Sequence, residues 1–286
     1  MQMNAKAKRI SAICALALAV QLLIQAIASL LLNKIVVVGA EYYLFRSALY
    51  VLTATLPMAV IVYLMKKNGI SAPTPRSFCT KGEGVLSVVG ASALIFAFGL
   101  VYKKIFPSVA DNIPLTLGSS LGEHVLAILS FVLIPAMLEE MFFRGCIARY
   151  TSVAGRPVAI IISALSFALV QYSNTVFPYA FLTGLVLGTL YFQTGKLKYS
   201  MIAHLLINFT GYMFTVSRLL LSPQSQYALE IAAFCAFTVA GMSILISYMK
   251  KISEALSRDE ECADATAIIT PALAIYVGLT TIAVLF

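Results

Sequence analysis

The chain has 286 residues, of which 60% are hydrophobic and 11% are charged, and its mean hydropathy is +0.93. Soluble domains carry about 25% charged residues, so this composition excludes an ordinary soluble domain and indicates a polytopic membrane protein. The net charge is +8, but the basic residues lie in short loops between apolar runs rather than in a stripe, which argues against nucleic-acid binding. We therefore expect one membrane domain over residues 1–286.

Nine apolar segments are candidates for membrane-spanning helices, because a span needs about 20 residues. They predict an all-α fold, a polytopic transmembrane helical bundle of about eight or nine spans. The first apolar run has 23 residues, which is longer than a signal-peptide core, so we expect it to be retained. The ninth contains Pro271, which weakens its assignment as a full crossing. The segments are 10–32, 46–65, 85–105, 124–143, 157–173, 177–195, 199–217, 226–249 and 266–286.

The distribution of basic residues predicts the orientation. With a cytoplasmic N-terminus, 15 of the 20 Lys and Arg residues fall in cytoplasmic segments and 5 in external ones. This threefold excess follows the positive-inside rule. We therefore expect a multi-pass integral membrane protein with its N-terminus in the cytoplasm, located in the cell membrane.

Two adjacent carboxylates lie inside the fourth segment, where a charge costs roughly 3 kcal/mol or more. Glu140 and Arg144 are four residues apart on one helix face, so they are expected to form a structural ion pair. Glu139 is rotated by about 100° and is expected to face whatever the bundle encloses. The alternative is that both acids serve packing, by neutralising Arg144 and another cation near the interface.

The seventh segment contains His204 and Asn208, which are also four residues apart and so share one helix face. Such a pair alone is better explained as an interhelical hydrogen bond. Depth favours a shared site, since Glu139 lies roughly 8 Å in from Arg144 and His204 roughly 9 Å in from Lys198. Both distances start from the predicted cytoplasmic side, so the carboxylate and the imidazole can meet.

These residues resemble motifs of a known family. Glu139-Glu140-x-x-x-Arg144, followed by His204-x-x-x-Asn208, is similar to the first and last motifs of the CAAX-protease and bacteriocin-processing (CPBP, or Abi) intramembrane proteases. The resemblance covers about residues 120–215. It implies a membrane endopeptidase, in which Glu139 is the general base and His204 and Asn208 stabilise the oxyanion.

One position departs from the pattern of this family. Its middle motif is FxxxH, and here Phe167 is followed four residues later by Gln171. An amide can orient a water molecule but cannot relay a proton. A helix that begins at Pro157 carries Gln171 about 21 Å deep, well past Glu139. Either that helix begins submerged or tilts strongly, or Gln171 is not in the site.

A metal cofactor is the less favoured alternative. Zinc requires three or four Cys, His or carboxylate ligands, whereas this region offers Glu139, Glu140 and one histidine, and HExxH is absent. The five scattered cysteines contain no CxxC pair, which argues against a zinc cluster and a disulfide framework. We therefore expect no cofactor.

Three functional hypotheses remain. The first is a CPBP-type peptidase that opens to the cytoplasmic side and cleaves a peptide or protein C-terminus presented at the lipid bilayer. The resemblance implies prenylated tails, leader peptides or signalling peptides as substrate classes. The second is a catalytically silent relative, with Gln171 in place of the histidine, that acts in immunity, peptide binding or scaffolding. The third is a transporter or an unrelated membrane protein, which predicts charges spread over several helices.

Overall fold

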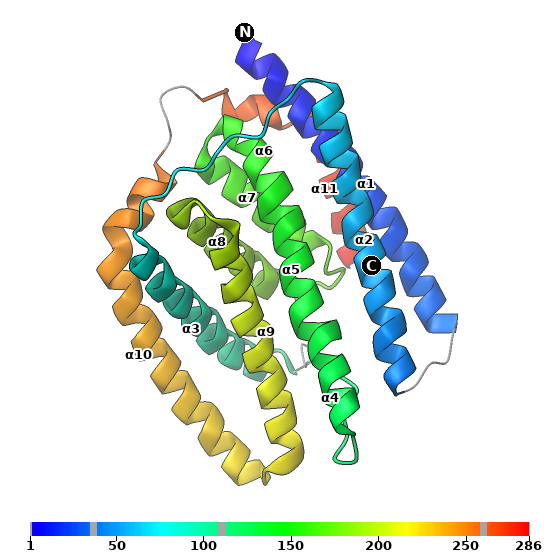
Figure 1. Cartoon of the computed structure of the whole chain (residues 1–286), viewed down its shortest axis with the longest axis vertical. Helices are drawn as coiled ribbons and strands as arrows, with labels where there is room; N and C mark the ends of the chain where they lie inside the picture. The colour runs from blue at the N-terminus through cyan, green and yellow to red at the C-terminus, as the bar shows by residue number, and fades with distance from the viewer. Residues whose placement is uncertain (1, 35–38, 108–112, 258–261, 286) are drawn as a thin grey trace.

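The computed structural model describes residues 2–34, 39–107, 113–257 and 262–285. Within these ranges the regular secondary structure is helical, which confirms the all-α prediction (Figure 1). Each of the nine expected segments coincides with a helix or a continuous helical rod. The elements are α1 (Gln2–Lys34), α2 (Ala40–Lys67), α3 (Lys81–Ile105), α4 (Leu121–Ala127), η2 (Ile128–Leu133), α5 (Ile134–Glu140), η3 (Met141–Ala148), α6 (Arg149–Thr151), η4 (Ser152–Ala154), α7 (Arg156–Leu169), α8 (Phe177–Thr194), α9 (Leu197–Leu220), α10 (Pro223–Leu256), η5 (Ala265–Ile268) and α11 (Pro271–Leu285).

Within the described residues, five helical rods are long and apolar enough to cross a membrane. These are α1, α2, α3, the continuous rod from α4 to η4, and α10. Two further apolar helices, α7 and α11, are shorter. The chain is therefore an integral membrane protein built as a helical bundle.

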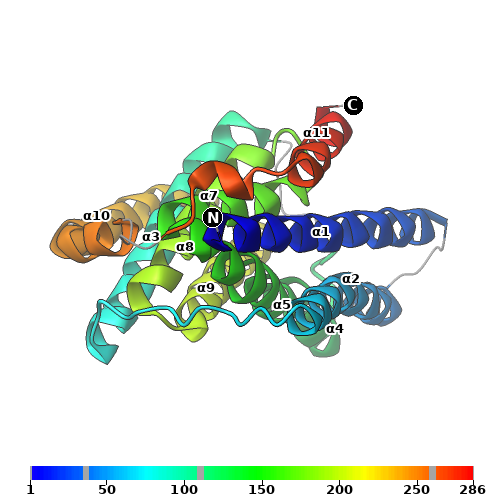
Figure 2. The same cartoon turned by 90° about the horizontal axis from the view of Figure 1, so that it is seen from above.

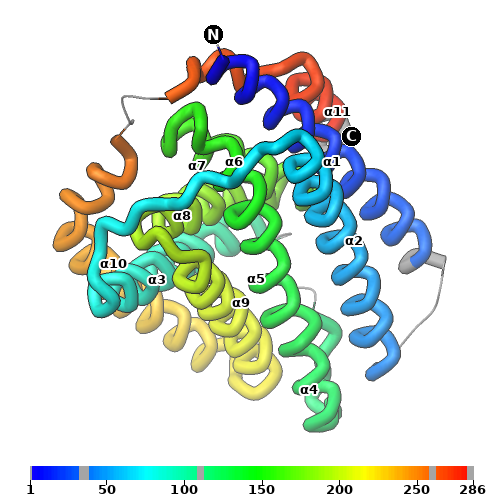
Figure 3. Tube along the Cα trace, turned by 45° about the horizontal axis from the view of Figure 1, so that its top comes forward, coloured from blue at the N-terminus to red at the C-terminus, as the bar shows by residue number. Residues whose placement is uncertain are grey.

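The rod from α4 to α6 is the centre of the bundle (Figures 1 and 3). α2 packs along one side of it and α9 along another. α1 covers α2, and α3 packs against both α9 and α10. Seen from above in Figure 2, α1 with α2 and α10 with α3 lie at opposite sides of the bundle. This arrangement places the two carboxylates of the central rod opposite the histidine of α9.

The central rod departs from ideal α-helix on both sides of the carboxylates. Two π-helical stretches, η2 and η3, flank the short helix α5 that carries Glu139 and Glu140. Pro135 has no N–H for the carbonyl four residues earlier, and its ring crowds that carbonyl. A wider turn before Pro135 relieves this conflict, and such π turns are frequent at functional sites.

α7 and α8 form a hairpin whose turn lies inside the bundle. The apolar segment predicted over 157–173 is helical only to Leu169, and the chain turns at Tyr172, which has a φ of 48°. The two helices meet at Gly184, where an added Cβ would lie 2.8 Å from Cα of Ala164. A larger residue at this position would separate the hairpin. The fifth prediction was thus too long, because apolar sequence continues past the end of the helix.

Candidate active site

Glu140 and Arg144 form an ion pair in the core of the bundle. Arg144 Nη1 lies 2.6 Å from Glu140 Oε1, and both side chains are 0% exposed. Arg144 also donates to the carbonyl oxygen of Gly184 at 3.0 Å, and its guanidinium lies over the ring of Phe167. The pair therefore ties the central rod to both helices of the α7–α8 hairpin.

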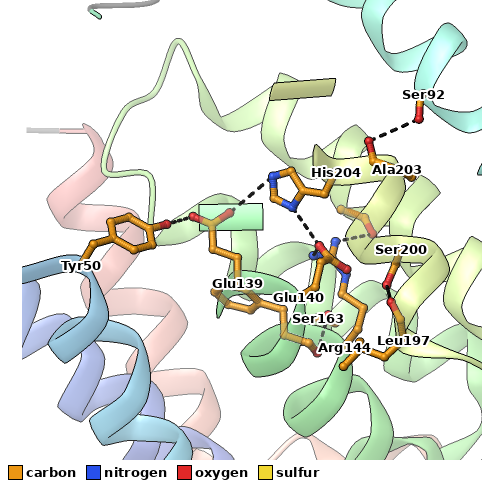
Figure 4. Close-up of polar contacts among 12 residues, drawn as sticks. Tyr50, Ser92, Glu139, Glu140, Arg144, Ser163, Leu197, Ser200, Ala203 and His204 are labelled. Carbon is orange, nitrogen blue, oxygen red and sulfur yellow. Dashed lines mark hydrogen bonds and ion pairs between the residues drawn. The ribbon is translucent and has the colours of Figure 1, made fainter. Parts of the chain in front are cut away.

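His204 lies between the two adjacent carboxylates (Figure 4). Its Nδ1 is 3.0 Å from Glu140 Oε1, and its Nε2 is 3.6 Å from Glu139 Oε2. The ring of Phe167 meets the imidazole edge-on, with 5.8 Å between the ring centroids. The imidazole is thus fixed in orientation, with Nδ1 toward the ion pair and Nε2 toward Glu139.

The position of His204 limits which protons it can carry. An ionised carboxylate only accepts hydrogen bonds, so the contact with Glu140 places a proton on Nδ1. A neutral His204 then presents a lone pair at Nε2, and only the imidazolium form donates from both nitrogens. Donation of a hydrogen bond from Nε2 therefore requires the imidazolium form.

A cavity of about 540 Å³ adjoins Glu139 and His204. Glu139, Gln171, His204 and Asn208 all line it, whereas Glu140 does not. The structure therefore brings four of the predicted residues to one space and leaves Glu140 behind them with Arg144. Among the described residues, the side-chain amides of Gln171 and Asn208 have no hydrogen-bond partner in the protein, so both can reach a molecule in the cavity.

The end of α7 explains how Gln171 reaches this space. Helical rise placed this residue well past Glu139, but α7 ends two residues before it and the turn of the hairpin borders the cavity. Ser173 and Val176 from the same turn also line it. Gln171 therefore lines the cavity next to Glu139 and His204, and it occupies the last position of the frame Phe167-x-x-x-Gln171.

The cavity extends in the direction opposite to our expectation. We expected the site to open toward the end that holds the N-terminus and most basic residues. Its lining instead continues along α9 to Tyr212 and Arg218 and along α3 to Lys103, which approach the other end of the bundle. The buried Glu140–Arg144 pair fills the space on the N-terminal side.

Two residues of α2 join the site that motif reasoning did not include. The Tyr50 hydroxyl donates a hydrogen bond to Glu139 Oε1 (Figure 4). Arg46, one turn earlier, lines the same cavity, donates to the Ser130 carbonyl at 2.6 Å and lies over the ring of Phe131. The only signal in the sequence was an arginine at the edge of an apolar segment, and nothing there linked Tyr50 to Glu139.

The described residues contain no group of three or more His, Cys, Asp or Glu side chains that could hold a metal ion. Glu140 is already engaged by Arg144 and His204. Glu139 and His204 are then the ligand types left at the cavity, which is fewer than a protein zinc site uses.

Comparison with known proteins identifies the segment that carries this site. Residues 121–210, which are 90 of the 286 residues, match the family model described as Rce1-like, type II CAAX prenyl endopeptidase Rce1-like. The match begins at α4 and ends in α9, so it contains Glu139, Glu140, Arg144, Gln171, His204 and Asn208. No curated protein and no solved structure shows significant similarity to the chain.

Proposed function

Because residues 121–210 match the family model of Rce1-like type II CAAX prenyl endopeptidases, we propose that this membrane protein is an intramembrane peptidase. The observation that carries the proposal is the convergence of Glu139, His204, Asn208 and Gln171 on one cavity. The substrate is a peptide or a protein C-terminus presented from the bilayer, with a prenylated tail as one class.

Glu139 acts as the general base in this proposal. Its carboxylate takes a proton from a water molecule as the water oxygen attacks the peptide carbonyl carbon. The resulting oxyanion is stabilised by His204 Nε2–H and by the amide of Asn208, which are donors typically worth a few kcal/mol each. The C–N bond then breaks, and the proton held by Glu139 passes to the leaving amine.

Glu140 and Arg144 support this chemistry without contacting the substrate. Glu140 holds His204 through Nδ1, and Arg144 balances the charge of Glu140. Gln171 orients the attacking water through its amide, but it cannot take or relay the proton.

A specific observation favours a second candidate function. Gln171 faces the cavity where the family pattern has a histidine, so a relative that binds peptides without cleaving them is the alternative. Such a protein would act in immunity, peptide binding or scaffolding. The cavity and the amides of Gln171 and Asn208 would serve both functions.

We propose that the reaction needs no metal, since Glu139 and His204 alone are too few ligands for a zinc site. We also propose that the protein lies in the cell membrane with its N-terminus in the cytoplasm, because basic residues are in excess at that end of the bundle. In that orientation the cavity beside Glu139 and His204 lies in the external half of the bundle.

The decisive experiment uses the purified protein in lipid vesicles with a panel of prenylated and unmodified peptides. Cleavage is followed by mass spectrometry, and binding is followed separately by peptide fluorescence. The peptidase hypothesis expects cleavage that persists in excess chelator. Binding without cleavage supports the silent alternative, and the absence of both contradicts each of them.

A further inference from the structure

α1 carries a line of polar residues at membrane depth. Gln21, Gln25 and Ser29 are spaced four residues apart, so they share one face of the helix within its otherwise apolar stretch 12–32. Leu23, which lies between them, points outward and is 62% exposed. Polar side chains in a span are costly, and they mark internal cavities more often than lipid-facing surfaces. α1 lies outside the segment that matches the family.

This polar line borders a second cavity, of about 490 Å³, between α1 and α2. Thr53 of α2 adds a further polar group to its wall. Arg46, Tyr50, Glu139 and Gln171 line this cavity and the first one alike. Glu139 therefore faces His204 and Asn208 on one side and the polar face of α1 on the other.

The groups around the second cavity are suited to holding water. The side-chain oxygen of Gln21 is buried and has no hydrogen-bond partner in the protein, which is costly unless water supplies one. Gln25 donates to the carbonyl oxygen of Val170 at 2.9 Å, directly before Gln171. Each water occupies about 30 Å³ of liquid, so the volume accommodates on the order of ten molecules.

We propose that the α1–α2 cavity is a water-filled chamber that supplies the hydrolytic water to Glu139. This inference rests on the proposed peptidase function. A peptide that fills the first cavity displaces its water, and the second cavity reaches the same carboxylate from the opposite side. Gln171 lines both the first cavity and the α1–α2 cavity, so its amide can hold a water molecule where the two meet.

The hydration of the chamber is tested by cysteine labelling in the full chain. The exposed Cys235 and the partly exposed Cys79 and Cys262 are first replaced by serine. Gln21→Cys and Gln25→Cys are then compared with Leu23→Cys, which lies at the intervening depth on the outward face. A charged methanethiosulfonate reagent modifies only a thiol that water reaches, because the thiolate is the nucleophile. We expect modification at positions 21 and 25 and none at position 23.

Gln21 is 13 residues from the end of α1, or about 20 Å by helical rise, so its modification cannot be explained by fraying of the helix end. Failure of the charged reagent at both positions, with reaction of an apolar maleimide instead, would show a chamber filled by lipid and would overturn the proposal. Reaction at all three positions would show a generally hydrated helix and would overturn it as well.

A kinetic measurement tests the supply of water. Modification of folded Gln25→Cys should lower kcat while KM stays unchanged, and reduction of the mixed disulfide should restore kcat. An unchanged kcat in the fully modified protein would overturn the role of the chamber. Labelling is measured without a substrate, so a labelled chamber in a protein that never cleaves would contradict the peptidase function and leave the chamber itself established.

Discussion

Replacement of Arg144 by alanine should destabilise the protein rather than alter its chemistry directly. The substitution removes the cation 2.6 Å from Glu140 and leaves a carboxylate that is 0% exposed without the arginine that balances its charge, although His204 Nδ1 remains 3.0 Å away. Breaking a buried pair in this way costs about 3–5 kcal/mol. At about 2–4 °C of unfolding temperature per kcal/mol for a chain of this size class, the expected decrease is roughly 10 °C.

The assay is thermal unfolding of the detergent-solubilised protein, read together with membrane yield. Arg149→Ala is the matched control, because Arg149 lies on the same rod and its guanidinium contacts the carbonyl oxygen of Pro73 rather than a carboxylate. This control should lower the unfolding temperature by far less. The double variant Glu140→Gln/Arg144→Met removes both charges and should recover part of the loss. An Arg144→Ala protein that is as stable as the wild type yet inactive would refute the structural assignment.

Three further substitutions test the cavity-lining residues by steady-state kinetics. Gln171→His should raise kcat, by up to the 10²–10⁴ typical of a general acid–base group, and an unchanged kcat would count against an active role at this position. Asn208→Ala should lower kcat by about 10²–10³ with little change in KM, because it removes an oxyanion donor. A rise in KM of the same size with kcat unchanged would instead show a role in substrate binding. Tyr50→Phe should lower kcat by roughly tenfold through loss of one hydrogen bond of about 1.5–3 kcal/mol to a charged group. Tyr43→Phe on the same helix, which loses only a bond to the Pro114 carbonyl, should not, and equal losses in the two variants would reject the positioning role of Tyr50.

Local geometry explains which parts of the site the sequence could predict. Residues four apart on a helix share a face regardless of the rest of the fold, so the Glu140–Arg144 pair followed from spacing alone. The meeting of Glu139 and His204 followed from equal helical depth, because neighbouring spans are constrained to one membrane thickness. Both inferences needed only the helix repeat and the bilayer.

Contacts that depend on which helices are neighbours could not be predicted in this way. Tyr50 reaches Glu139 only because α2 packs against the central rod, and no spacing rule encodes that choice. Hydropathy also could not locate the end of α7, since the apolar sequence continues through Val170 into the turn. The direction of the cavity was predicted wrongly for a related reason, because loop charge reports on orientation and not on where side chains leave space.

The central claim is that Glu139 activates water for peptide hydrolysis, and ¹⁸O incorporation tests it most directly. Wild-type protein and the Glu139→Gln variant are incubated with a cleavable peptide in H₂¹⁸O, and the new carboxyl terminus is analysed by mass spectrometry. Glutamine is nearly isosteric with glutamate but cannot take the proton. We predict one ¹⁸O atom in the wild-type product and a loss of at least about 10²-fold in rate for the variant, with membrane yield intact. Equal turnover by a well-folded Glu139→Gln protein would contradict the claim.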